Sequence, residues 1–135
     1  MTQDRTGHCL CGACAYAFPP GAVRFQALCH CDACRRAAGA PVVGWIGVTD
    51  GQWRWTGARP ATHHSSPGVT RHFCPTCGSQ LTYAATRWPG ETHFTAATLA
   101  DPATFHPTLH VNHAHALPWA RIDDSLPRFA GFGPD

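Results

Sequence analysis

The chain has 135 residues, a length typical of one domain, and we expect a single domain over residues 1–135. Its formal net charge is +2, all ten basic residues are Arg, and no basic run longer than Arg35–Arg36 is present, which argues against a nucleic-acid partner. No stretch approaches the roughly 20 apolar residues of a membrane span or the apolar core of a signal peptide, so we expect a cytoplasmic protein without membrane contact.

The N-terminal part of the chain predicts strands followed by a short helix. Large and small side chains alternate over residues 13–18 and again over 23–29, and we expect these two strands to form a hairpin. Asp32 is typical of a helix N-cap, and Gly39 is typical of a helix end. A helix is therefore expected over residues 33–38.

The rest of the chain predicts mainly β structure. The polar stretch over 57–68 is interpreted as a surface loop, and a strand over 52–56 would place Trp53 and Trp55 on one face. The remaining expected strands are 42–48, 70–74, 81–85 and 92–97, with a further short strand around His110. The expected fold class is mainly β, with several antiparallel strands and one or two short helices.

The eight cysteines fall into three clusters. These are Cys9-Leu-Cys11-Gly-Ala-Cys14, Cys29-His-Cys31-Asp-Ala-Cys34 and Cys74-Pro-Thr-Cys77. A disulfide scaffold would need an oxidising compartment. Two cysteines separated by one residue on a strand also bridge poorly, whereas their thiolates can converge on a metal about 2.3 Å from each sulfur. Metal binding is the favoured interpretation, and it suits a chain in which Ile, Leu, Val and Phe together number only 22.

Cys74-Pro-Thr-Cys77 also has the spacing of a thiol redox motif. Such motifs open a helix, but the residues from Gly78 onward predict a turn and then a strand. A glycine lets the backbone turn past Cys77 and direct amide groups at the sulfurs, as in a zinc knuckle. The zinc deaminase signature is absent from the sequence, because no His-x-Glu precedes the knuckle.

The residues around the cysteines form further short motifs. They are Gly7-x-Cys9-x-Cys11-Gly12, Cys29-His30-Cys31-x-x-Cys34-Arg35, Arg71-x-Phe73-Cys74-x-x-Cys77-Gly78, Leu99-x-Asp101-Pro102 and Pro118-Trp119. In order and spacing they resemble the glutathione-dependent formaldehyde-activating enzyme (GFA) family, which also includes centromere protein V. The resemblance runs from about residue 7 to about residue 131. It implies a small, zinc-stabilised, tent-like β fold.

The resemblance also implies two Zn²⁺ ions per chain. The implied ligands are Cys9, Cys11, Cys74 and Cys77 for a structural zinc, and Cys29, Cys31 and Cys34 for a second, catalytic zinc. Three protein ligands leave a fourth position open, as expected of a catalytic site. A helix that starts beside these sulfurs would favour their thiolate forms.

Two functions remain open at this stage. The resemblance implies a zinc-dependent carbon–sulfur lyase acting on thiol–aldehyde adducts, similar to S-(hydroxymethyl)glutathione synthase. Its partners would be a small thiol such as glutathione and a small aldehyde such as formaldehyde. The alternative is a non-catalytic, zinc-stabilised binding module for a protein or a small molecule.

Two residues inside the clusters, Cys14 and His30, each have two possible roles. Cys14 shares a predicted strand face with Tyr16, so we expect a buried, inert thiol. If Cys14 instead reached the second zinc, it would close that site. His30 is expected to point away from the metal, where it is solvated or supports a ligand, and the alternative is a role in proton transfer.

Several residues outside the clusters have more than one possible role. His110, His113 and His115 are interpreted as surface histidines, as residues lining a pocket near the second zinc, or as metal ligands, since His113 and His115 would share a strand face. Arg71 and Ser66 are candidates for binding a substrate carboxylate, and a surface salt bridge is the alternative for Arg71.

Overall fold

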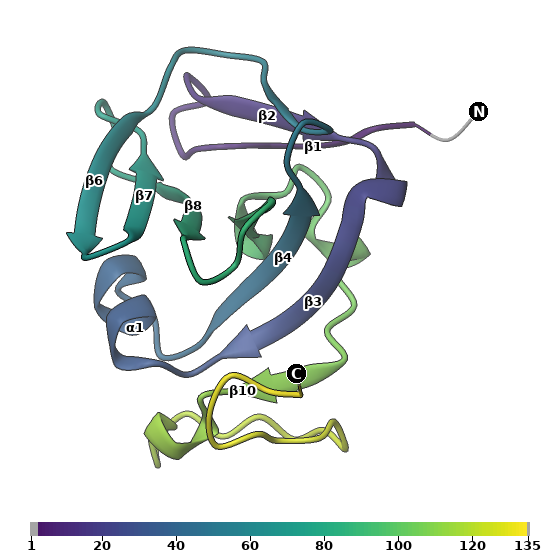
Figure 1. Ribbon diagram of the computed structural model, residues 1–135, viewed down its shortest axis with the longest axis vertical. Helices are drawn as coiled ribbons and strands as arrows, with labels where there is room; N and C mark the ends of the chain where they lie inside the picture. The colour runs from purple at the N-terminus through teal and green to yellow at the C-terminus, as the bar shows by residue number, and fades with distance from the viewer. Residues whose placement is uncertain (1–2, 135) are drawn as a thin grey trace.

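A computed structural model describes residues 3–134, and it is mainly β, as the sequence predicts. The described residues form one three-stranded and one seven-stranded sheet (Figure 1). The smaller sheet has the antiparallel order β1-β2-β5. Its strands are β1 (Arg5–His8), β2 (Ala15–Phe18) and β5 (Arg54–Trp55).

The larger sheet has the order β10-β3-β4-β9-β8-β7-β6. Its strands are β3 (Val23–Cys29), β4 (Val43–Thr49), β6 (Ala61–Ser66), β7 (Val69–Phe73), β8 (Gln80–Ala85), β9 (Glu91–Thr95) and β10 (Leu109–Val111). Neighbouring strands are antiparallel except β10, which runs parallel to β3. That pairing sets Val111 beside Cys29.

One α-helix, α1 (Asp32–Ala38), is present in the described part of the chain. Its N-cap is Cys31 and not Asp32, because the Cys31 Sγ atom accepts the Cys34 backbone N–H at 3.2 Å. Short 3₁₀ turns occur at η1 (Pro20–Ala22), η2 (Ala96–Thr98), η3 (Pro102–Thr104) and η4 (His113–His115). Within residues 3–134, no helix is long and apolar enough to cross a membrane.

The main core lies between the two sheets and is built on aromatic side chains. Tyr16 and Phe18 from β2 are fully buried and pack on Phe94 of β9, with ring centroids 4.5 Å and 5.6 Å from it. Tyr16 also exchanges a 2.8 Å hydrogen bond with the Thr98 hydroxyl. Gly7 lies against this ring, and a Cβ atom there would overlap it.

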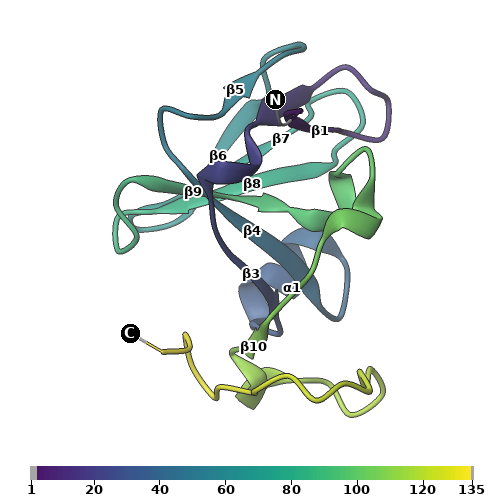
Figure 2. The same ribbon diagram turned by 90° about the vertical axis from the view of Figure 1, so that its right-hand side faces the viewer.

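Two expectations about the strands are wrong. The segments around β2 and β3 do not form a hairpin: β2 pairs with β1 and β5, whereas β3 pairs with β4 and β10. The 3₁₀ turn Pro20–Ala22 separates them and leads the chain from one sheet into the other (Figure 2). The polar stretch expected as a loop contains β6, which pairs only with β7 at the sheet edge, where polar side chains can face water.

Candidate metal centres

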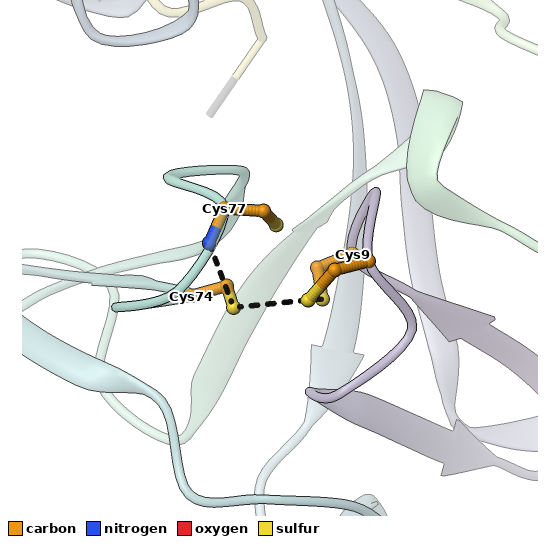
Figure 3. A group of neighbouring side chains, drawn as sticks. Cys9, Cys74 and Cys77 are labelled. Carbon is orange, nitrogen blue, oxygen red and sulfur yellow. Dashed lines mark hydrogen bonds between the residues drawn. The ribbon is translucent and has the colours of Figure 1, made fainter.

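Two loops far apart in sequence meet at a group of four cysteines, the four-cysteine cluster. Cys9 and Cys11 lie in the turn between β1 and β2, and Cys74 and Cys77 lie in the turn between β7 and β8. Figure 3 shows Cys9, Cys74 and Cys77 pointing toward one another across these turns. The cluster therefore joins the small sheet to the large one.

The sulfur spacing in this cluster suits a tetrahedral metal. The Sγ atoms of Cys9 and Cys11 are 3.6 Å apart, and those of Cys11 and Cys74 are 3.8 Å apart. Zinc–sulfur bonds of about 2.3 Å in a tetrahedron separate the sulfurs by about 3.8 Å, whereas a disulfide brings them to about 2.05 Å. All eight cysteines are free thiols. The four sulfurs all lie within 4.8 Å of one another, so the cluster could hold zinc.

Backbone and hydroxyl groups around the cluster favour the ionised form of two of its sulfurs, those of Cys74 and Cys77. The Cys77 N–H lies 3.5 Å from the Cys74 Sγ atom and lowers the pKa of Cys74. The Ser79 hydroxyl, 3.3 Å from the Cys77 Sγ atom, lowers the pKa of Cys77 to about 5. Gly78 makes this turn possible, since its φ of 80° is a left-handed conformation that other residues rarely adopt.

Cys14 is fully buried beside the four-cysteine cluster. Burial and the neighbouring Cys74 and Cys9 sulfurs raise the pKa of Cys14 to about 11, which keeps the thiol protonated. Its backbone N–H donates to the Cys9 Sγ atom at 3.3 Å. Cys14 thus lies beside the first cluster and is not part of the second.

The second group, the three-cysteine cluster, forms where β3 meets α1. Cys29 ends β3, Cys31 caps α1, and Cys34 lies in the first turn of α1. Their three sulfur atoms lie within 4.8 Å of one another. The Cys29 and Cys34 thiols and the Cys34 backbone N–H lower the pKa of Cys31 to about 2, so Cys31 is the sulfur that ionises first. Three converging thiols with this electrostatic bias could hold a soft metal such as zinc.

Asn112 is a site residue that the sequence analysis missed. Its side-chain amide donates to the Cys29 Sγ atom at 3.4 Å. Among the described residues other than glycine, Asn112 alone has a positive φ, at 52°, and its N–H is held by the Gly131 carbonyl at 2.6 Å. The sequence offered one signal for this role: Asn112 lies between His110 and His113, and Asn adopts a positive φ more readily than most residues.

His30 and His110 are buried and hydrogen-bonded to each other. His30 is 2% exposed and His110 is fully buried, and the His30 Nε2 and His110 Nδ1 atoms are 2.8 Å apart. His110 Nε2 in turn lies 2.9 Å from the Asp124 carboxylate, which also binds Arg128. The His110 hydrogen bond lowers the pKa of Asp124 to about 2, and burial lowers the pKa of His30 to about 4. His30 is not solvated and His110 is not a surface histidine, so those two expectations are wrong, whereas the expectation that His30 supports a ligand stays a prediction.

His113 and His115 differ from His110. Both lie in the 3₁₀ turn η4 and not on a shared strand face, and His115 is exposed. His113 packs edge-on against His30, with ring centroids 4.8 Å apart. Within residues 3–134, none of the three histidines belongs to a cluster that could hold a metal or lines the cavity beside the cysteines.

A cavity of about 430 Å³ adjoins the three-cysteine cluster, and all three cysteines line it. Most of its wall is aromatic or aliphatic. These side chains include Phe25, Trp45, Val69, Tyr83, Trp88 and Phe132. The polar lining groups include Ser66, Arg71, Glu91, His93 and Asn112. The cavity gives a small molecule access to the cysteine sulfurs.

Arg71 lies in the wall of this cavity and is only 6% exposed. Its Nε–H donates to the Ser65 hydroxyl at 3.0 Å, and its guanidinium lies 5.1 Å from the centre of the Tyr83 ring. Arg71 forms no ion pair within residues 3–134, so the alternative expectation of a surface salt bridge is wrong. Ser66 is exposed at the same cavity.

Comparisons with known proteins find one matching family and a solved structure with a similar fold. The model of the family described as glutathione-dependent formaldehyde-activating enzyme matches residues 4–115. Among curated proteins, no sequence matches the chain. Among solved structures, a crystal structure of a Rhodobacter sphaeroides protein is similar, with a TM-score of 0.55 and 22% identity over 71% of this chain and 88% of that chain. At this identity, the likeness supports the fold alone.

Proposed function

Because the chain belongs to the glutathione-dependent formaldehyde-activating enzyme family, we propose that it is a zinc-dependent carbon–sulfur lyase acting on adducts of small thiols and small aldehydes. The observation that carries the proposal is the three-cysteine cluster in the wall of the 430 Å³ cavity. Glutathione and formaldehyde are the substrates that family membership supports first. We place this activity in a single domain over residues 1–135 and in the cytoplasm, where the thiols stay reduced.

The two clusters have different proposed roles. Cys9, Cys11, Cys74 and Cys77 bind a structural zinc, because four sulfurs complete a tetrahedron and leave no position for a substrate. Cys29, Cys31 and Cys34, which line the cavity, would hold the second zinc. With three protein ligands, such a zinc would favour the thiolate form of a substrate sulfur.

The chain's own residues hold the reactants in place. Asn112 and the Cys34 backbone N–H fix the Cys29 and Cys31 sulfurs by hydrogen bonds of 3.4 Å and 3.2 Å. The cavity walls bring the thiol sulfur close to the aldehyde carbon and exclude water. In the synthetic direction the sulfur–carbon bond forms as the carbonyl π bond opens, the oxygen gains a proton and the thiol loses one. The lyase direction reverses each change.

An exchange measurement by NMR tests the proposal. The zinc-loaded protein should speed the exchange between formaldehyde, glutathione and their adduct above the spontaneous rate. Cys31→Ser should abolish the acceleration, and Cys14→Ala, which alters a buried thiol outside both clusters, should retain it. No acceleration with glutathione or with other thiols would overturn the lyase and leave the zinc-stabilised binding module as the function.

A further inference from the structure

We propose that Arg71 and the apolar walls of the cavity form a carboxylate-binding subsite that selects thiols with an apolar body and a single carboxylate. As a statement about substrate choice, this inference rests on the proposed lyase function. The subsite itself rests on the residues that line the cavity, and its main test uses ligands that contain no thiol.

The hydrogen bonding of Arg71 is incomplete. The residue is 94% buried, yet its Nη1 atom has no hydrogen-bond partner in the described residues, and Nε–H donates to Ser65. A buried, unsatisfied N–H group is costly, and a guanidinium gains most from the two oxygens of a carboxylate. The geometry favours a ligand that brings a carboxylate to this group.

The one carboxylate among the described lining residues is already paired. Glu91 accepts from Arg24 at 2.9 Å and lies 3.0 Å from the His93 Nε2 atom. Among the described lining residues, Arg71 is therefore the one cation without a carboxylate partner, and no carboxylate is left for a ligand cation. Glutathione carries two carboxylates and an ammonium group, so its burial here would leave charges unpaired, which is expensive.

The walls beyond Arg71 fit a flat, apolar ligand body. Trp45 and Tyr83 pack against each other with their ring centroids 5.9 Å apart. The ring centroids of Trp88 and Phe132 are 5.7 Å apart. Phe132 lies outside residues 4–115, the part matched by the family model. One wall of the cavity therefore comes from a segment beyond the family match, which is where selectivity peculiar to this chain can arise.

Binding of a matched pair of ligands tests the subsite. The two probes are 3-phenylpropanoate and its neutral amide, which have the same shape and differ in charge. Their dissociation constants for the zinc-loaded protein can be followed through the fluorescence of the lining tryptophans or by calorimetry. We expect the carboxylate to bind at least about tenfold more tightly than the amide. Equal binding of the two probes overturns the proposal.

Variants assign the preference to Arg71. Arg71→Gln should bring the carboxylate-to-amide ratio close to one, whereas Arg54→Gln, which removes an exposed arginine paired with Asp4, should leave the ratio unchanged. Arg71→Lys should retain an intermediate preference, and it replaces Arg71→Gln as the test if that variant does not fold. Equal weakening of both probes would mean that Arg71 only balances the charge of the cysteine cluster, and would overturn the proposal.

A thiol series separates this inference from the lyase function. In the exchange assay, 4-(mercaptomethyl)benzoate should exceed both benzyl mercaptan and glutathione in kcat/KM. A preference for glutathione would overturn the subsite and retain the lyase. A tenfold carboxylate preference in binding, with no acceleration of exchange by any thiol, would retain the subsite and overturn the lyase.

Discussion

His30 and His110, eighty residues apart in the sequence, share a 2.8 Å hydrogen bond in the protein interior. His30 lies between two of the three cysteines of the second cluster, and His110 is held from its other side by Asp124 at 2.9 Å. The His110 Nε2–H donates to Asp124, because a carboxylate can only accept. This series of hydrogen bonds connects His30, inside the cysteine cluster's segment, to Asp124 in the C-terminal segment.

Removing His110 should loosen the three-cysteine cluster. His110→Ala leaves the buried Nε2 atom of His30 without its hydrogen-bond partner, which should lower the free energy of unfolding by about 1–3 kcal/mol. It should also weaken zinc binding at the three-cysteine cluster, by up to about 10–100-fold as for other groups that support metal ligands, and so speed zinc release to a chelator. His115→Ala, in the exposed part of the same region, is the control and should change neither quantity. Unchanged zinc release from His110→Ala would show that the histidine pair does not position the cluster.

Cys77→Ser should unfold or aggregate the protein. The substitution removes one ligand of the four-cysteine cluster, whose two loops are at least 63 residues apart in the sequence, the separation of Cys11 and Cys74. Closure of so long a loop by metal constrains the unfolded chain strongly. The loss should exceed the roughly 0.5–3 kcal/mol of an ordinary point substitution. Thermal unfolding with zinc analysis measures it, and Cys14→Ala is the control for loss of a buried thiol.

Cys31→Ser should leave a folded protein. Cys29, Cys31 and Cys34 enclose one short turn, so a metal there constrains little of the unfolded chain. We expect a melting temperature within several degrees of the native value, together with loss of one zinc ion and of lyase activity. If Cys31→Ser destabilises the chain as severely as Cys77→Ser, the second zinc is structural, and the binding-module function gains support.

Gly47→Ala should push an aromatic ring toward the cavity. Gly47 on β4 faces Phe25 on β3, and a Cβ atom at position 47 would overlap the Phe25 ring. Overpacking of this kind costs about 1–3 kcal/mol, and the displaced ring should weaken the binding of 3-phenylpropanoate. Gly21→Ala, where a Cβ atom meets nothing within 4 Å, is the control. Native affinity in Gly47→Ala would mean that Phe25 does not shape the cavity.

The cysteine spacing and the alternating strands were informative because both are local patterns. Two cysteines two or three residues apart are close in any extended or turning backbone, and a strand's period of two appears in the sequence directly. Gly78 and Gly39 likewise signal a turn and a helix end, and both have positive φ.

Long-range contacts explain what sequence reasoning missed. His110 is buried because residues near Asp124 and Arg128 return across it, and the pairing of β3 with β4 instead of β2 depends on which sheet each strand completes. Arg71 is covered by Ser65 near the end of β6 and by Tyr83 on β8. None of these contacts leaves a pattern within one stretch of sequence.

The zinc content of the native chain is the sharpest test of the claim that the two cysteine clusters hold one zinc each, with the second open to the cavity. Native mass spectrometry combined with elemental analysis, on protein purified without chelator, should give two zinc ions per chain, and mild chelation should remove one of them first. A value of one or none that added zinc does not restore to two, or disulfides that persist under reducing conditions, would contradict the claim.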